Sequence, residues 1–363
     1  MASAVETLIR GVVTKGVTKV AEFNRGRMTA DAPNPYLVGI HAPMASELTI
    51  DDLSVTGTIP AALNGRYIRI GPNPAAPAHH ASYHWFTGDG MVHGVKLKGG
   101  KAEWYRNRWI KSKKVTAALG LADTPGPRHG PSDTVNTNVL SHAGAIWALV
   151  EAGGYPVRIN EELETIAHDP FGGTLKGGFT AHPHLDNDSG EMHAICYEGT
   201  DQTTIRHVVV GKDGKVRREE PITVQDGPSI HDCMITKNYV IILDLPVTFS
   251  MKTLLAGHPF PYAWNPDHRA RVGLLPKDGK DADVIWCEVE PCYVFHPCNA
   301  YEDATGKIIM DVCAHDTMFA QSKIGPDSAS VPFERWSIDP VTRQTARTII
   351  DADSQEFPRP NEA

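Results

Sequence analysis

Hydrophobic and polar positions follow two different patterns along the chain. Over residues 3–23, apolar side chains recur at spacings of three and four, which places them on one stripe of an α-helix. Ser3 followed by Glu6 has the form of a capping box at its start. Two glycines and many β-branched residues lower the helix propensity, so we expect this amphipathic helix to fold against a surface, either the protein's own body or a membrane.

From residue 47 onward the pattern changes to short apolar runs separated by turn signals. The runs cover residues 66–70, 145–151, 191–197, 203–210, 239–245, 284–290, 292–296 and 307–313. The turn signals are Gly99-Gly100, Asp188-Ser189-Gly190, Lys212-Asp213-Gly214, Ala304-Thr305-Gly306 and Asp339-Pro340. Such residues suit hairpin turns, where glycine supplies a positive φ. Many short strands at regular spacing indicate an all-β repeat or barrel, although no sequence repeat is strong enough to count its units.

Composition narrows the class of protein. Of the 363 residues, 41% are hydrophobic and 21% are charged, which is usual for a soluble globular protein. The length allows two ordinary domains or one repeating all-β domain. The net charge is −8 and no basic run exceeds Lys111–Lys114, which argues against a nucleic-acid-binding surface. No signal peptide and no apolar run of spanning length is present, so we expect a soluble or peripheral, cytoplasmic protein.

The six cysteines lie in or beside apolar runs and form no CxxC pair. We therefore expect buried thiols in a reducing compartment, and neither a disulfide framework nor a zinc site.

Three of the seventeen histidines stand at the edges of strand-like runs: His182, His231 and His296. They are separated by 49 and 65 residues (231 − 182 and 296 − 231), which suits one histidine from each successive sheet of a propeller. Neutral imidazoles bind Fe, Cu, Zn and Ni alike, so the ligand type names no metal. His184 is the nearest rival to His182, because either ring could face the axis.

A lone histidine in a β protein is more often a hydrogen-bonded structural residue than a ligand. Five further histidines in strand-like runs are interpreted in that way: His93, His142, His193, His207 and His315.

At the three histidine motifs the chain resembles the carotenoid cleavage oxygenase family. The motifs are Phe179–His184, Ile230–Thr236 and Tyr293–Glu302. Further matches, in the family's order, are Gly71–Pro74, Phe86–His93, Asn136–Val139 and Gln355–Arg359. The resemblance runs from about Pro35 to the end of the chain and is greatest to the bacterial branch. The family also includes the retinal pigment epithelium isomerase and lignostilbene dioxygenases.

This resemblance implies a seven-bladed β-propeller with Fe(II) on its axis, held by four histidines. His182, His231 and His296 match the first three ligands. Glu151 and Glu356 match glutamates that accept hydrogen bonds from the ligands' other ring nitrogens and so orient them. The implied organisation is an N-terminal helix and linker over residues 1–34, followed by an oxygenase domain over residues 35–363.

The sequence departs from the family near its C-terminus. The family's fourth histidine and a third glutamate have no counterpart in this sequence. We therefore expect a C-terminally truncated, incomplete propeller. The activity that the resemblance implies is therefore that of the full-length family enzyme, whose iron has four histidine ligands.

The implied reaction is Fe(II)-dependent cleavage of a conjugated C=C bond of a carotenoid or apocarotenoid by O₂, giving two carbonyl products. One alternative is the family's stilbene-cleaving branch, which holds a phenol with a tyrosine and a lysine. This chain has Trp109 and Ser132 where we align those residues, which favours a polyene. The other alternative is a non-catalytic fragment that binds carotenoid or lipid.

The segment over residues 249–262 resembles the family's membrane-facing tunnel mouth. Together with the N-terminal helix it predicts peripheral attachment at the inner face of a membrane, from which a lipophilic substrate would be drawn. A loop packed under a neighbouring blade is the alternative interpretation.

Overall fold

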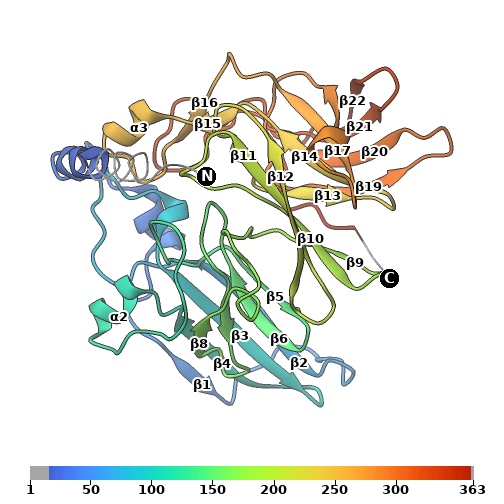
Figure 1. Cartoon of the computed structure of the whole chain (residues 1–363). Helices are drawn as coiled ribbons and strands as arrows, with labels where there is room; N and C mark the ends of the chain where they lie inside the picture. Colours follow the sequence, from blue (N-terminus) through green and yellow to red (C-terminus); the bar gives the residue numbers. More distant parts are fainter. Residues whose placement is uncertain (1–15, 361–363) are drawn as a thin grey trace.

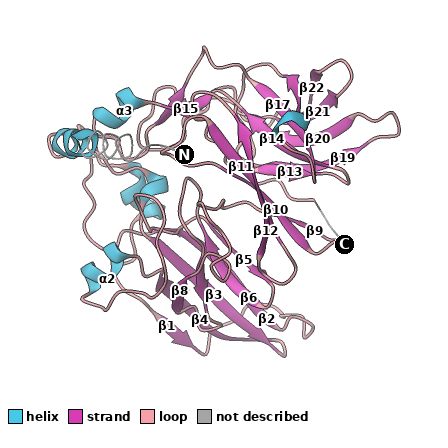
Figure 2. Cartoon of the chain, viewed as in Figure 1, coloured by secondary structure: helices cyan, strands magenta, loops and turns pink. Residues whose placement is uncertain are grey.

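The computed structural model describes residues 16–360, and strands dominate it (Figures 1 and 2). Most of them form five four-stranded antiparallel units, which we call blades I to V in chain order. Blade I consists of β1 (Thr49–Asp51), β2 (Gly65–Pro72), β3 (Gly90–Lys98) and β4 (Lys101–Trp109), and β1 lies beside β4. Blade II consists of β5 (Asn138–His142), β6 (Ala145–Leu149), β7 (Val157–Ile159) and β8 (Thr165–His168). Blade III consists of β9 (His184–Asp186), β10 (Glu191–Cys196), β11 (Thr204–Val210) and β12 (Val216–Thr223).

Blades IV and V share one sheet. Blade IV consists of β13 (Cys233–Ile235), β14 (Tyr239–Asp244), β17 (Arg271–Pro276) and β18 (Ile285–Glu288). Blade V consists of β19 (Pro297–Glu302), β20 (Ile308–Cys313), β21 (Phe333–Asp339) and β22 (Gln344–Asp351). A parallel pairing of Glu288 with Gln344 joins the two blades. A ribbon of β15 (Val247–Phe249) and β16 (Tyr262–Trp264) interrupts blade IV and carries α3 (Met251–Leu255) between its strands.

The hairpin turns lie where the sequence predicts them. Gly99-Gly100 connects β3 to β4, and the other four turn signals connect β9 to β10, β11 to β12, β19 to β20 and β21 to β22. The glycines in four of these turns have positive φ values, between 56° and 85°. Glycine adopts this left-handed conformation without a steric penalty, so these turns connect their strands without backbone strain.

The core lies between neighbouring blades. One apolar cluster joins blades I and II around Val92, Trp104 and Ala148, and another joins blades II and III around Leu149 and Ala194. The largest cluster extends through blades III, IV and V. The first strands of successive blades also touch, β9 with β13 and β13 with β19. Sheets that pack face to face around their first strands are typical of a propeller, which confirms the predicted all-β architecture.

Two of the family-like motifs brace blade I against blade II. A Cβ on Gly90 would lie 1.8 Å from the carbonyl oxygen of Val135, so only glycine allows this close approach of the two backbones. Beside it, the Asn136 side-chain amide donates to the carbonyl oxygens of Phe86 and Gly88, at 2.9 and 2.7 Å. These motifs hold the segment before β5 against the start of β3 in blade I.

Helices are few and lie at the edges. Of the helix expected over residues 3–23, residues 16–23 are helical and the helix continues to residue 25, whereas residues 3–15 lie outside the described residues. Asn24 and Arg25 at its end donate to the carbonyl oxygens of Leu255 and Gly257, so the helix rests on the end of α3. No helix of the described part is long and apolar enough to cross a membrane. The division at residues 34 and 35 stays a prediction.

The other short helical elements of the described residues are η1 (Pro35–Leu37), η2 (Gly39–His41), η3 (Trp85–Thr87), α2 (Lys113–Leu119) and η4 (Asp281–Asp283).

Two stacked histidines inside blade III make its stability depend on pH. Nδ1 of His193 lies 3.1 Å from Nε2 of His207, and both residues are buried. Burial lowers the pKa of His193 to about 4 and that of His207 to about 3. Between pH 6.5 and about 4 the unfolded chain therefore binds protons that the folded chain does not, and folding stability falls as the pH falls.

We expect the free energy of unfolding in urea to decrease from pH 7 to pH 5, by up to about 1.4 kcal/mol per pH unit for each such histidine. Replacing His207 with glutamine removes one of the two titrating side chains, so the free energy of unfolding should fall less steeply with pH. His80→Gln, at an exposed position, is the control. An unchanged pH dependence in His207→Gln would contradict the assignment.

Candidate metal centre

Three histidines converge where the first strands of blades III, IV and V begin. His182 lies two residues before β9, His231 two residues before β13, and His296 directly before β19. Because β13 touches both β9 and β19, the three side chains meet although they come from different blades. Each residue is at most 8% exposed. The structure thus brings together the histidines that the sequence analysis selected.

The three rings face one another closely. The ring centroid of His182 lies 4.5 Å from that of His231 and 5.1 Å from that of His296, and the last two centroids are 5.0 Å apart. Nε2 of His231 lies 3.2 Å from Nε2 of His296. Nε2 of His182 is buried and has no hydrogen-bond partner in the described part of the chain. One ring nitrogen from each residue lies within 4.8 Å of the others, an arrangement that could hold a metal ion.

Two carboxylates hold two of the rings from the opposite side. Nδ1 of His231 lies 3.0 Å from Oε1 of Glu151, and Nδ1 of His296 lies 2.8 Å from Oε2 of Glu356. A ring that donates its Nδ1 proton keeps the lone pair of Nε2 free for a metal. Glu151 follows β6 and Glu356 follows β22, so the carboxylates come from blade II and from the segment after blade V. Their role in orienting metal ligands stays a prediction.

The electrostatics favour a neutral ring at His182 and His296 but not at His231. Burial lowers the pKa of His182 well below its usual value, and the neighbouring histidines lower it further. Burial also lowers the pKa of His296, against the opposing effect of Glu356. For His231 burial acts in the same direction, but the charge and hydrogen bond of Glu151 outweigh it and raise the pKa. Burial raises the pKa of Glu356, yet hydrogen bonds from two histidines outweigh it and lower the pKa to about 2.

These residues fit a divalent transition metal. An unpartnered buried nitrogen, two neighbouring imidazole nitrogens and two carboxylates behind the rings are the donors and supports that such a metal uses. The donor set alone defines a metal centre and does not select the ion.

His184, the rival of His182, has a different partner. Its Nε2 lies 2.8 Å from Oδ1 of Asp232, and the same oxygen accepts the backbone N–H of Cys233. These three residues also form a compact group of possible ligands. However, burial raises the pKa of the Cys233 thiol well above its usual value, which disfavours the thiolate that a metal needs. We interpret the group as a cross-link between the beginnings of β9 and β13.

The cysteines form no disulfide among the described residues; five are buried and Cys298 is half-buried. This confirms the interpretation of the cysteines as buried thiols for five of the six.

Two further residues, which the sequence patterns did not indicate, lie beside the centre. His315, interpreted from the sequence as structural, directs Nε2 at Oε1 of Glu356. Phe357 stacks on the ring of His296, with the centroids 3.9 Å apart. A histidine in a strand-like run and a phenylalanine next to Glu356 carry no spacing signal, so only the three-dimensional structure reveals these contacts.

A chain of aromatic rings leads from the centre to the β15–β16 ribbon. Phe295 meets His231 edge to face at 5.0 Å and Phe86 at 5.9 Å. Phe86 in turn meets Phe260, which belongs to the segment over residues 249–262, at 5.5 Å. The histidine centre is therefore connected by apolar rings to the segment that the sequence analysis associates with substrate entry.

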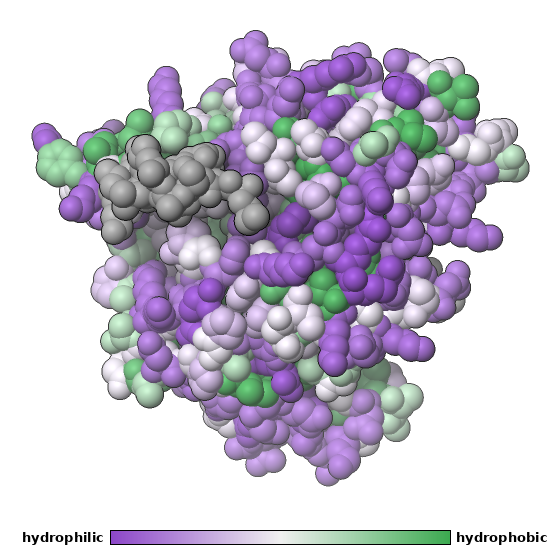
Figure 3. Space-filling view, viewed as in Figure 1, coloured by the Kyte–Doolittle hydropathy of each residue, from purple (hydrophilic) through white to green (hydrophobic). Residues whose placement is uncertain are grey.

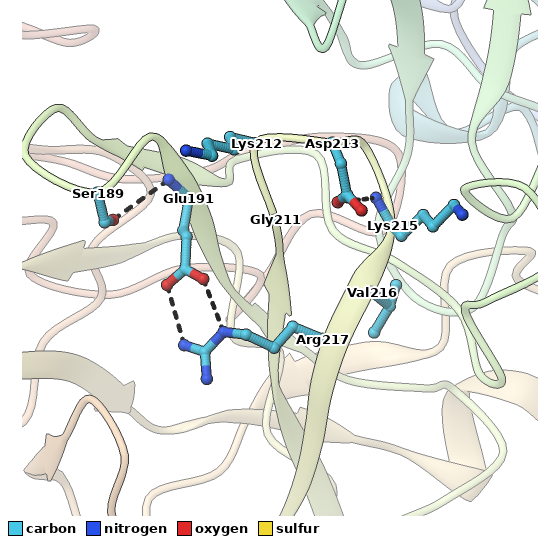
Figure 4. A pocket seen from close by; sticks show the side chains of 8 residues that line it. All are labelled: Ser189, Glu191, Gly211, Lys212, Asp213, Lys215, Val216 and Arg217. Carbon is cyan, nitrogen blue, oxygen red and sulfur yellow. Dashed lines mark hydrogen bonds and ion pairs between the residues drawn. The ribbon is translucent and has the colours of Figure 1, made fainter.

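The groove shown in Figure 4 is not part of this centre. It lies at the ends of the β9–β10 and β11–β12 hairpins, and its lining is mostly charged. Glu191 and Arg217 in its lining form a bidentate ion pair, with N···O distances of 2.7 and 2.9 Å. None of the three clustered histidines lines it, so we interpret it as a solvated surface between two turns.

Comparisons with known proteins agree with this architecture. A family model described as retinal pigment epithelial membrane protein matches residues 41–363. The chain is 42% identical to a carotenoid cleavage oxygenase of Mycobacterium tuberculosis, over 92% of this chain and 75% of that protein. It is 31% identical to carotenoid 9,10(9',10')-cleavage dioxygenase 1 of Arabidopsis thaliana, over 92% of this chain and 68% of that protein.

Solved structures have the same fold. The lignostilbene dioxygenase of Pseudomonas brassicacearum superposes with a TM-score of 0.78 at 24% identity, covering 91% of this chain and 74% of that one. Cobalt-substituted Synechocystis apocarotenoid oxygenase superposes with a TM-score of 0.72 at 24% identity, covering 85% and 71%. The fold and the histidine centre define a β-propeller with a candidate metal site. The chain belongs to the carotenoid oxygenase family, which includes stilbene-cleaving relatives.

We expect Glu151→Gln to weaken binding of a divalent metal by about tenfold or more, because outer carboxylates of metal-binding histidines typically contribute that much. The measurement is an anaerobic Co(II) titration followed by the visible absorption of the bound ion. Glu302→Gln is the matched control, since Glu302 accepts from Thr236 and Asn238 and touches none of the three rings. Equal affinities of Glu151→Gln and the wild-type chain would contradict the role of Glu151.

Proposed function

We propose that this protein uses Fe(II) and O₂ to cleave a conjugated C=C bond of a carotenoid or apocarotenoid into two carbonyl products. The observation that carries the proposal is the buried trio of histidines with two carboxylates behind it, in a chain of the carotenoid oxygenase family. The relatives from Mycobacterium tuberculosis and Arabidopsis thaliana, both named for carotenoid cleavage, support the substrate class.

His182, His231 and His296 would hold the iron through ring nitrogens. When bound, Fe(II) would supply the activation of O₂. The protein's own contribution is positional: Glu151 and Glu356 keep two rings in the tautomer whose Nε2 is unprotonated. Burial of all three rings keeps bulk water from the centre, which strengthens the electrostatic effects of the carboxylates there.

The surroundings of the centre favour a polyene over a hydroxystilbene. Phe295, Phe86 and Phe260 offer aromatic faces and edges to an apolar conjugated chain. At the positions aligned with the phenol-binding residues of the stilbene branch, Trp109 is 3% exposed and donates its indole N–H to Asn73, and Ser132 is exposed. Neither residue is placed to hold a phenol.

The test offers an apocarotenal and a hydroxystilbene together to protein loaded anaerobically with Fe(II), then exposed to O₂. We expect mass spectrometry to find a pair of carbonyl fragments from the apocarotenal, with one oxygen atom added to each. His231→Ala should form none, because it removes a ring from the centre.

Cleavage would also show that three histidines of this chain suffice. Cleavage of the stilbene alone would overturn the substrate class. Apocarotenal binding without bound iron and without products would instead favour the non-catalytic binding role.

We also propose that the protein attaches to a membrane surface from the cytoplasmic side, through residues 249–262 and the N-terminal helix. Large apolar side chains are exposed there, among them Val20, Phe23 and Met251. Figure 3 shows hydrophobic residues gathered around the helix over residues 16–25 and near α3. Because lipophilic substrates partition into bilayers, an apolar face beside the aromatic chain would give them a short route to the centre.

Replacing Phe23 and Met251 together with serine should reduce co-flotation with phospholipid vesicles by several-fold, because it removes exposed apolar area from this face. Tyr67→Ser is the matched control, since Tyr67 is 65% exposed but lies on β2 of blade I. Wild-type protein found wholly in the soluble fraction would rule out the attachment.

A further inference from the structure

His315 is held rigidly beside blade V. It lies two residues after β20 and forms an isolated bridge with Tyr293, whose two N···O distances are 2.9 and 2.7 Å. Its side chain is 5% exposed, and its ring meets Phe295 at 90° with the centroids 5.3 Å apart. Backbone and ring contacts together leave His315 little freedom to move.

Glu356, in contrast, lies on a segment without regular structure. Residues 352–360 follow β22, and the nearest backbone bond joins the N–H of Gln355 to the carbonyl oxygen of Val331. The carboxylate is 28% exposed, so water can compete for it. Its position therefore depends on the side chains that bind it.

The two carboxylate oxygens of Glu356 have different partners. Oε2 accepts from Nδ1 of His296 and from the backbone N–H of Phe357. Oε1 is bound by Nε2 of His315. The same segment places Phe357 on the face of His296, so Glu356 and Phe357 contact this ring at its Nδ1 and at its face.

Glu151, the other carboxylate behind the rings, has no second side-chain partner comparable to His315. Its Oε1 binds His231, whereas its Oε2 is buried and has no partner in the described part of the chain. Glu151 lies two residues after β6, so its blade positions it. Glu356 lies five residues beyond β22, so its blade does not position it. Apart from the ring of His296, the side chain that binds its carboxylate is that of His315.

We propose that His315 is a positioning residue, which fixes the Glu356 carboxylate so that it orients His296 toward the metal. The proposal rests on the proposed function for the identity of the centre. It adds a third residue to a relay that runs from His315 through Glu356 to His296, with one hydrogen bond at each step. Loss of the anchor should allow the carboxylate to turn toward water and the ring of His296 to lose its fixed orientation.

The experiment compares Co(II) affinity of the full chain with that of His315→Leu and His315→Gln. Leucine removes the donor, whereas glutamine offers an amide N–H close to the position of Nε2. We expect the Kd of His315→Leu to rise about tenfold and that of His315→Gln to stay within about threefold of the wild-type value. His93→Leu, which removes the hydrogen bond of His93 to Tyr105 in blade I, is the matched control and should leave the Kd unchanged.

A double-mutant cycle separates positioning from a general loss of structure. In the Glu356→Gln background, adding His315→Leu should change the Kd less than about twofold, because the relay is already broken. The proposal is overturned if His315→Leu binds Co(II) as tightly as the wild-type chain. It is also overturned if the effect is undiminished in the Glu356→Gln background.

A metal-free readout distinguishes failure of this proposal from failure of the metal centre itself. Wild-type protein that binds neither Co(II) nor Fe(II) would overturn the function proposed above. In that case the ¹⁵N resonances of His296 decide whether His315 positions the relay. They should report a protonated Nδ1 in the wild-type chain and shift in His315→Leu as they do in Glu356→Gln. Unshifted resonances in His315→Leu would overturn the positioning role.

Discussion

The pairing of buried imidazoles with carboxylates is the constraint on which the centre depends. Two ring nitrogens lie 3.2 Å apart and a third has no partner, an arrangement that is unfavourable for lone pairs alone. The carboxylates of Glu151 and Glu356 fix the protons on the far sides of two rings, so the inner nitrogens cannot all be satisfied by exchanging protons among themselves. A cation between the rings would resolve this conflict, and the same carboxylates would balance its charge.

The propeller makes such a convergence possible. Each histidine precedes the first strand of its blade, and these first strands lie side by side around the axis. Residues separated by 49 or 65 positions in sequence thus reach one point without any long loop. The apolar clusters between neighbouring blades hold the strand ends in place, so the packing of the blades determines how closely the rings approach.

Sequence patterns predicted those features that depend on local chemistry. Short apolar runs separated by glycine-containing turns predicted the hairpins. The family motifs selected His182, His231 and His296 from the seventeen histidines, because these three stand at the edges of strand-like runs. The contacts of His315 and Phe357 could not be predicted in this way. They join an irregular segment to residues 41 and 61 positions earlier (356 − 315 and 357 − 296), and no periodicity describes such a segment. The aromatic chain through Phe86, Phe295 and Phe260 was missed for the same reason.

The strands and the irregular segments therefore have separate physical tasks. Strands place the three rings and are fixed by burial, so changes there affect folding first. The segment that carries Glu356 has no regular structure and contacts the ring of His296. The segment that carries Phe260 contacts the aromatic chain that ends beside His231. Because irregular segments generally open at lower free energy than strands, changes in these two segments would alter the proposed metal affinity and substrate access while the blades stay folded.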